Sequence, residues 1–308
     1  ETGLTKEETI KVTNTDGTLT ETTKFIDESG ESVEVEVQTK LSTAETQTKD
    51  DGTVVTTATA TTDDGEALQI QVQINPNGTV QNSFTIGDKS SDVDVAIVGA
   101  DTVIREDGAI ETTAKVTSDT GDNLTTKVEV KIDGTTTSSV EIVDASSKKT
   151  TAEITVAIVG ADTRVKSDGA IETTAEITTA ENVKTVAKVE VKADGATANS
   201  VEVTNSTGEL VVTKLDTNIA GASSSISTDG SITIKTPTLE VQTGEKIAIE
   251  VVVNNTGSVK PNIILEDKII EMPEFEAGSD VNVKQENGKV LVEVRTILNK
   301  SITYNQGN

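Results

Sequence analysis

The side chains of this chain that could perform chemistry are almost all carboxylates. Its 308 residues include 52 Asp and Glu but no His and no Cys. Serine triads, thiol nucleophiles and typical zinc sites are therefore excluded, because each needs an imidazole or a thiolate. A spaced acidic pair would suffice for a glycosidase, but only three Phe, one Tyr and no Trp are present to stack on a sugar. We expect no enzyme and no organic cofactor, with a carbohydrate-active β-helical enzyme as the alternative.

Calcium is the one metal that these carboxylates suit, since it takes hard oxygen ligands. Asp92 and Asp94 flank one valine on the same side of an expected strand. Asp119 and Asp122 bracket a Thr-Gly pair in an expected turn. Neither pair matches an EF-hand loop. We interpret all four residues as solvated acidic positions and keep a calcium-stiffened fibre as the alternative.

The charge balance narrows the range of partners. With 26 Lys and Arg against 52 Asp and Glu, the net charge is -26. Nucleic acids and anionic membrane surfaces need clustered positive charge, so we expect neither as a partner. No apolar run approaches 20 residues, so we expect no membrane insertion. An acidic surface stays soluble and suits an extracellular or cell-surface location. The start at Glu1 without methionine fits an exported and processed chain as well as a cloning remnant at residues 1–3.

A repeat of about 61 residues positions these groups. Similar apolar stretches occur at 96–101, 157–162 and, more weakly, 218–223. Asp-Gly and Asn-Gly pairs predict two-residue hairpin turns, because both residues can adopt positive φ. Their spacing alternates between 26 and 35 positions, so each repeat has two unequal halves. The predicted parts are an N-terminal half-repeat (1–50), three repeats (51–107, 108–168 and 169–229) and a modified C-terminal repeat or small β domain (230–308).

Between the turns, apolar and polar residues alternate. Residues 127–132 read Lys-Val-Glu-Val-Lys-Ile, the period of a strand with one solvated face. The sequence predicts an all-β, elongated and repetitive antiparallel structure with about four strands per repeat. Stacked hairpins and a β-solenoid-like coil both remain open. We place Gly99, Gly160 and Gly221 inside an apolar strand, where a bulge or bend requires glycine.

Both ends of the chain fall partway through a repeat. Gly17 would open a second half and Gly288 a first half. We expect an unpaired edge on the N-terminal strand 9–13 and on the C-terminal strands 289–296, where edge strands can recruit another chain. A head-to-tail contact of this kind does not close, so it propagates as a filament. The predicted interface residues are Thr9, Ile10, Lys11, Val12, Val290, Val292 and Val294. The predicted main partner is thus the protein itself, as a homopolymer.

One stretch resembles a known class of proteins. Residues 241–257 combine Gly-Glu, an alternating strand and Asn-Thr-Gly, and this resembles secreted prokaryotic β-sandwich adhesion modules. The Thr-rich Asp-Gly repeats resemble those of large bacterial surface fibres and adhesins. The resemblance implies a secreted structural protein with a surface glycan or cell-surface target as a further partner. A monomeric adhesin stalk or tail-fibre segment is the alternative to a self-assembling filament.

Overall fold

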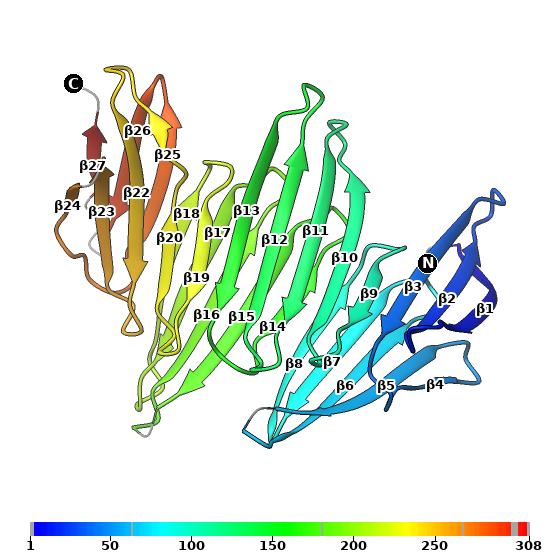
Figure 1. Cartoon of the computed structure of the whole chain (residues 1–308). Helices are drawn as coiled ribbons and strands as arrows, with labels where there is room; N and C mark the ends of the chain where they lie inside the picture. The colour runs from blue at the N-terminus through cyan, green and yellow to red at the C-terminus, as the bar shows by residue number, and fades with distance from the viewer. Residues whose placement is uncertain (1–2, 63, 180, 267, 297–300, 307–308) are drawn as a thin grey trace. The chain divides into compact units, whose positions relative to one another are not determined.

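The computed structural model describes residues 3–62, 64–179, 181–266, 268–296 and 301–306. Every regular element in these ranges is a β-strand, which confirms the all-β prediction (Figure 1). No described segment forms a helix of the length and apolarity needed to cross a membrane. The chain divides into two compact units, which we call unit 1 (Glu1–Ser139 and Val159–Ile171) and unit 2 (Val140–Ile158 and Glu172–Asn308).

The described strands form two sheets, of 14 and 13 strands, and unit 1 contains a part of each. One part has the strand order β1-β2-β3-β9-β10-β11, and the other has the order β14-β8-β7-β6-β5-β4. The strands are β1 (Thr5–Thr13), β2 (Leu19–Ile26), β3 (Ser32–Thr39), β4 (Glu45–Thr48), β5 (Val54–Thr61), β6 (Ala67–Ile74), β7 (Val80–Ile86), β8 (Lys89–Val95), β9 (Asp101–Ile104), β10 (Ile110–Thr117), β11 (Asn123–Val130) and β14 (Asp162–Val165). Strand β12 (Thr136–Val143) carries the chain from unit 1 into unit 2.

Unit 2 contains another part of each sheet. One part has the order β13-β19-β20-β22-β23-β24, with β21 paired to β22, and the other has the order β27-β26-β25-β18-β17-β16-β15. The strands are β13 (Lys149–Val156), β15 (Ile171–Thr178), β16 (Lys184–Val191), β17 (Thr197–Thr204), β18 (Leu210–Thr217), β19 (Ser223–Ile226), β20 (Ile232–Lys235), β21 (Leu239–Glu240), β22 (Lys246–Val253), β23 (Val259–Leu265), β24 (Lys268–Glu271), β25 (Asp280–Glu286), β26 (Lys289–Arg295) and β27 (Ser301–Gln306).

The backbone shows a shorter period inside the 61-residue repeat. Residues with positive φ follow position 108 at 121, 134, 147 and 160, in steps of 13, and the next step, to 169, is 9. A step of 13 holds an eight-residue strand and its turn, whereas the step of 9 holds a four-residue strand. Each full repeat therefore forms a block of one short and four long strands. Ser147 and Asn182 occupy two of these turn positions, so counting Asp-Gly and Asn-Gly pairs missed the period.

The hairpin turns differ from the predicted type. In the turn after β9, the Gly108 N–H donates to the Arg105 carbonyl at 3.0 Å, and the Arg105 N–H donates to the Ala109 carbonyl at 2.9 Å. Gly108 has a φ of 92°, but Asp107 is not among the residues with positive φ. The Asp107 carboxylate instead accepts from the Ala109 N–H at 3.0 Å. This is a three-residue loop with one left-handed residue, so the prediction of a two-residue turn is wrong here.

The Gly-Ala-Asp stretches are crossovers between strands. In unit 1 the chain leaves β8 at Val95 and enters β9, in the facing sheet, at Asp101. Gly99 lies in the turn between them with a φ of 82°. Gly160 and Gly221 likewise lie in turns between strands, so their predicted position inside a strand is wrong. The Ala-Ile-Val run that suggested a strand is apolar because the crossover itself is packed against the sheets.

Short parallel pairings, which we call joints, connect successive blocks in a sheet. Unit 1 has the joints β3–β9 and β8–β14, and unit 2 has β13–β19 and β18–β25. Within blocks the hairpins are antiparallel, as predicted. At two joints the first carboxylate of the incoming strand accepts a backbone N–H of its neighbour, Asp101 from Glu36 at 3.1 Å and Asp162 from Asp92 at 3.2 Å.

The two sheets of unit 1 pack face to face. The Asn82 side chain on β7 donates to Thr112 Oγ1 on β10 at 2.6 Å, across the interior. Thr112 Oγ1 in turn lies 3.0 Å from Thr102 Oγ1 on β9. Around these polar groups the inward positions are buried and apolar, as in Leu68 and Phe84. The alternation of buried and exposed residues along each strand thus gives each sheet an inner face and an outer face.

Candidate functional site

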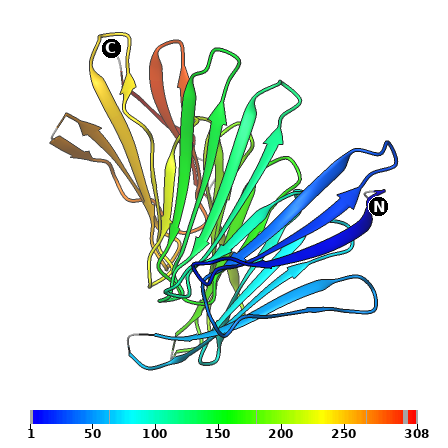
Figure 2. The ribbon, with the colours of Figure 1, turned by 45° about the vertical axis from the view of Figure 1, so that its right-hand side comes forward.

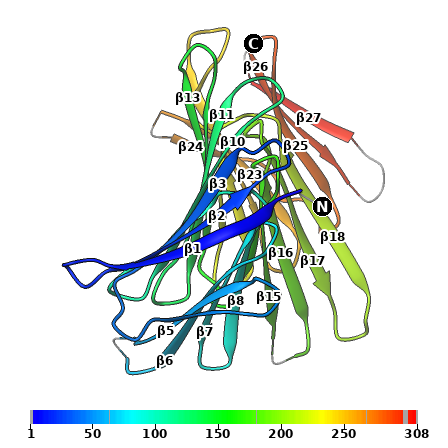
Figure 3. The ribbon, with the colours of Figure 1, turned by 90° about the vertical axis from the view of Figure 1, so that its right-hand side faces the viewer.

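Four strands lie at the ends of the two sheets and have a free edge, meaning that no strand of the described chain pairs with their outer side. These are β1 and β4 in unit 1 and β24 and β27 in unit 2. Figure 3 shows β1 beside β2, with no strand on its other side. Figure 2 shows the β23–β24 hairpin, in brown, at the edge of its sheet. A free edge presents unpaired N–H and C=O groups to which another strand can add.

The N-terminal half of the predicted interface lies on such an edge. Thr9, Ile10, Lys11 and Val12 all belong to β1, which pairs only with β2. Ile10 is 49% exposed and Val12 is 47% exposed. The structure therefore places these four residues where another strand could reach them.

The C-terminal half of the predicted interface does not lie on an edge. Val290, Val292 and Val294 belong to β26, which pairs with β25 on one side and with β27 on the other. All three valines are buried in the interior of unit 2. The free edge belongs instead to β27, which the sequence interpretation overlooked. The Ile-Thr-Tyr alternation at 302–304 is the short signal that could have identified this strand.

Large exposed apolar side chains concentrate on the free edges. Six such residues are exposed among the described part of the chain, and five of them lie on β1, β24 or β27. The five are Ile10, Val12, Ile269, Ile270 and Ile302. The sixth, Leu210, lies at the start of β18, where the strand pairs with β17 but not with β25, since the β18–β25 pairing covers only residues 214–217. Exposed apolar surface on an edge strand is typical of a strand that binds a partner.

The inner face of β1 is charged. A β-bulge between Lys6 and Glu8 shifts the register, so that Lys11 pairs with the inward-facing Glu21 and Ile10 faces outward. The Lys11 Nζ donates to the Thr46 carbonyl of β4 at 3.0 Å. The Lys6 Nζ donates to the Gly52 carbonyl at 3.3 Å. Lysines and bulges on edge strands are common protections against unwanted strand addition.

Glu21 gives these lysines a buried counter-charge. Its carboxylate is almost fully buried and accepts a hydrogen bond from Thr56 Oγ1 at 3.3 Å. Burial lowers the pKa of Lys6, and the negative charge of Glu21 acts in the opposite direction. The interior of unit 1 is therefore polar and charged beside β1.

The corresponding end of unit 2 is apolar. Ile270 on β24 pairs with the buried Ile263, and Ile302 on β27 pairs with the buried Val294. Directly paired residues lie on the same face of a sheet, so both isoleucines face inward. They are nevertheless 43% and 37% exposed, because no further strand covers them. This end of unit 2 therefore presents inward apolar side chains to solvent.

The four calcium candidates remain in two separate pairs. Asp92 and Asp94 lie on the outer face of β8 at the β8–β14 joint. Asp119 and Asp122 lie at the β10–β11 turn, where Asp122 accepts from the Thr120 hydroxyl at 2.8 Å. Among the residues that the structure describes, no three acidic side chains gather in a metal-binding arrangement.

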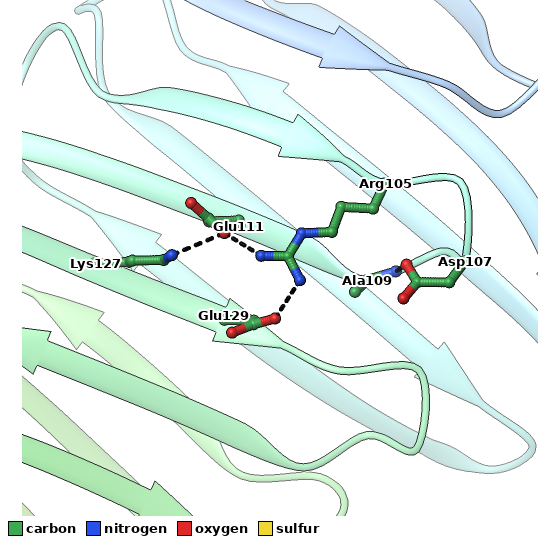
Figure 4. Close-up of polar contacts among 6 residues, drawn as sticks. All are labelled: Arg105, Asp107, Ala109, Glu111, Lys127 and Glu129. Carbon is green, nitrogen blue, oxygen red and sulfur yellow. Dashed lines mark hydrogen bonds and ion pairs between the residues drawn. The ribbon is translucent and has the colours of Figure 1, made fainter.

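Charged side chains on the outer faces pair across strands, and Figure 4 shows the densest example. Arg105, after β9, contacts Glu111 on β10 and binds Glu129 on β11 at 2.5 Å. Lys127 binds the same Glu111 at 2.9 Å. Opposite charges on neighbouring strands stabilise a sheet modestly. We interpret this cluster as a solvated ion network that supports the antiparallel register.

Asp162 makes the β8–β14 joint sensitive to pH. Partial loss of hydration raises the pKa of Asp162; the Asp92 N–H opposes this shift, and the charges of Asp92 and Asp94 add to it. The folded state therefore binds a proton at higher pH than the unfolded chain does. When it is ionised, this carboxyl therefore lowers the stability of the folded state. The loss disappears as the pH falls below 3.8, which is the ordinary pKa of an aspartate.

Replacing Asp162 with Asn is therefore expected to stabilise the fold at pH 7. The gain should stay below about 1 kcal/mol, because the side chain is largely solvated. Urea unfolding at pH 7 and pH 3 checks this, and the difference should vanish at pH 3. Asp27→Asn is the opposite control and should lower stability at pH 7. A hydrogen bond from the Ser29 hydroxyl lowers the pKa of Asp27, so the ionised Asp27 stabilises the fold. An unchanged stability of Asp162→Asn at pH 7 would contradict the account.

The sequence matches no family model and no curated protein. Among solved structures, it is similar to Drosophila Plexin A in complex with Semaphorin 1b, at 8% identity and a TM-score of 0.20, over 98% of this chain and 85% of that one. It is also similar to the SapL1 lectin in complex with alpha methyl fucoside, at 10% identity and a TM-score of 0.23, over 98% and 93%. A third is the Hadza microbial sialidase Hz136, at 10% identity and a TM-score of 0.22, over 94% and 63%. These scores are too low to assign a fold family or a function.

Proposed function

We propose that the protein is a structural subunit of an extracellular filament or surface fibre that assembles head-to-tail through edge strands. The observation that carries this proposal is the concentration of exposed apolar side chains on strands with a free edge. Adding a strand to such an edge satisfies its N–H and C=O groups and covers its apolar side chains at the same time. Contact between two different edges leaves one of each free, so the assembly can continue.

The repeat supports a structural role. Successive blocks in a sheet are connected by the same parallel joint, four times in the described chain. Each joint extends a sheet by a further set of antiparallel strands, and the blocks β9–β13 and β14–β18 each have one four-residue and four eight-residue strands. A chain built in this way gains length without changing its local chemistry.

Assembly is expected to depend on salt. The net charge of -26 makes copies repel one another at low ionic strength. Salt screens this repulsion over about 10 Å at 0.1 M. Light scattering and negative-stain electron microscopy should therefore show more polymer at 0.5 M than at 0.01 M sodium chloride. Polymer that is absent at every salt concentration would argue against a filament.

Ile269→Lys and Ile270→Lys should each weaken assembly by at least about tenfold, because a lysine on the edge strand β24 must be desolvated on strand addition. Gln71→Lys is the charge control, because it adds the same charge at an exposed position on β6 that is paired on both sides, with Thr57 and with Ser83. Equal weakening by all three substitutions would point to net charge rather than edge contact as the cause.

A monomeric adhesin stalk is the second candidate. Two free edges carry residues that oppose strand addition, and this favours a monomer. Lys11 binds the Thr46 carbonyl at the β4 edge, and Pro273, which has no N–H, follows directly after β24. A polar depression of about 580 Å³ over β18, β25 and β26 offers groups of both signs to a surface glycan, including Asp216, Glu293 and Arg295. A monomeric rod that binds glycan arrays would support this candidate over the filament.

A further inference from the structure

The internal joints show what a complete edge contact of this chain looks like. At the β8–β14 joint, Val93 pairs with Thr163 and Asp94 pairs with Arg164, in parallel. The Asp92 N–H donates to Asp162, and the Ala96 N–H closes the joint on the Val165 carbonyl. Inward side chains such as Val93 are covered when the joint forms. At three of the four joints, those of β9, β14 and β19, the incoming strand is a four-residue strand that opens a block.

Strand β4 has the same design but lacks the parallel neighbour. It is a four-residue first strand, like β9 and β14, and begins with the acid Glu45, as they begin with Asp101 and Asp162. The second residue of β4 is Thr46, and its Oγ1 lies 3.0 Å from Thr56 Oγ1 on β5. In the same way, Thr102 Oγ1 on β9 lies 3.0 Å from Thr112 Oγ1 on β10. Among the described strands, β4 pairs only with β5. The free edge of β4 is therefore one side of a joint.

The direction of the backbone groups on β4 follows from its hairpin. The Lys49 N–H donates across the turn to the Thr53 carbonyl. Backbone groups alternate in direction along a strand, so the N–H and C=O groups of Thr46 and Thr48 face the free edge. The Lys11 Nζ binds the Thr46 carbonyl at this edge, at 3.0 Å. Lys11 thus occupies an acceptor that a neighbouring strand would use.

Strand β24 provides the complementary side. It is the last strand of its block, as β8 is, and pairs only with β23. The Met272 N–H donates to the Pro261 carbonyl on β23, so the backbone groups of Ile269 and Glu271 face the free edge. In the register of the β8–β14 joint, Ile269 and Glu271 take the places of Asp92 and Asp94.

This register explains the exposed isoleucine. Ile270 takes the place of the buried Val93, so a strand added here would cover a side chain that faces inward and is 43% exposed. Pro273 then falls at the place of Ala96. Since proline has no N–H, only the closing hydrogen bond of the joint is lost.

We propose that β24 of one copy pairs in parallel with β4 of a second copy, forming between chains the joint that the fold repeats within the chain. The occupant of each edge is thus another copy of this protein. Lys11 protects the β4 edge and leaves the Thr46 carbonyl when the joint forms. This inference rests on the proposed head-to-tail assembly and names its contact.

Two proline variants of the full chain test the joint. Thr48→Pro removes a free-edge N–H from β4, and Glu271→Pro removes one from β24, while the N–H groups that face β5 and β23 remain. Thr48→Val and Glu271→Gln are the matched controls that keep the N–H. Each proline variant alone is expected to stop at the monomer. An equimolar mixture is expected to form dimers and nothing longer, because one intact β24 edge meets one intact β4 edge.

Sedimentation velocity with electron microscopy separates the outcomes, and circular dichroism confirms that the variants are folded. Polymers of wild-type length from either proline variant alone would overturn the joint but leave the filament proposal standing. Failure of the mixture to dimerise would also overturn the joint. Lys11→Met should assemble at a lower protein concentration than wild type, and Lys11→Arg should not. If wild type and Lys11→Met both stay monomeric at all concentrations and salts, the joint and the filament are both wrong.

Discussion

Replacing Phe84 with alanine is expected to lower the free energy of unfolding of unit 1 by about 3–5 kcal/mol, the range for truncating a fully buried aromatic side chain. Phe84 is 1% exposed and lies on β7 between Ile70 on β6 and Ser91 on β8. With only three Phe and no Trp in the chain, few side chains of this volume fill the space between the sheets. The facing sheet cannot collapse into the space, because hairpin turns and joints hold its strands.

Urea unfolding followed by far-UV circular dichroism measures this loss, since the chain has no Trp and one Tyr as fluorescent probes. The two compact units can unfold in separate steps, so the transition that moves identifies unit 1. Phe84→Leu is the control and should cost less, because it keeps most of the buried volume. A loss below about 1 kcal/mol for Phe84→Ala would show that this interior is loosely packed.

Replacing Gly134 with alanine is expected to cost about 3 kcal/mol, from two sources. Gly134 has a φ of 77°, where a Cβ is strained. A Cβ here would also lie 2.6 Å from Val159 Cγ1 and 3.2 Å from Val159 Cγ2. Because both methyl groups of Val159 face the turn, rotating the valine side chain does not relieve the overlap. The turn between β11 and β12 would have to move away from the crossover.

Gly121→Ala separates the two sources. Gly121 has a φ of 87° and no atom within 4 Å of its hypothetical Cβ, so it carries the backbone strain alone, about 1 kcal/mol. The same urea experiment measures both variants. Equal losses would mean that packing of the turn against the Gly-Ala-Asp crossover contributes nothing, and would remove one reason for the strict repeat of these stretches.

The joint and the stability predictions concern the same feature of the fold. Crossovers bring the first strand of each block against the last strand of an earlier block in its sheet. Turn glycines such as Gly134 let the crossover pack closely. If the joint between copies uses the same geometry, its strength should follow the backbone groups of β4 and β24 more closely than their side chains.

Local patterns were enough to predict the strands and the repeat. Alternation along residues 127–132 identifies a strand because side chains of a strand point to opposite faces in turn. The exposed residues on β1 were also found from sequence, since the partial repeat before Gly17 indicated an incomplete block. These inferences need only the chain's nearest neighbours in sequence. The 13-residue step was equally local, but Ser147 and Asn182 hid it by replacing glycine at a left-handed position.

Only the tertiary structure decided which faces and edges are free. The bulge between Lys6 and Glu8 reverses the side of β1 that Ile10 occupies, because a shift of one residue exchanges the two faces of a strand. Val290 on β26 is buried because β27 covers that edge. The parallel joints, and with them the match between β4 and β24, depend on strands 65 to 70 residues apart, as at Val37 and Thr102. Pairings over such distances leave no periodic signal, since hydrogen bonds between backbones are independent of side-chain identity.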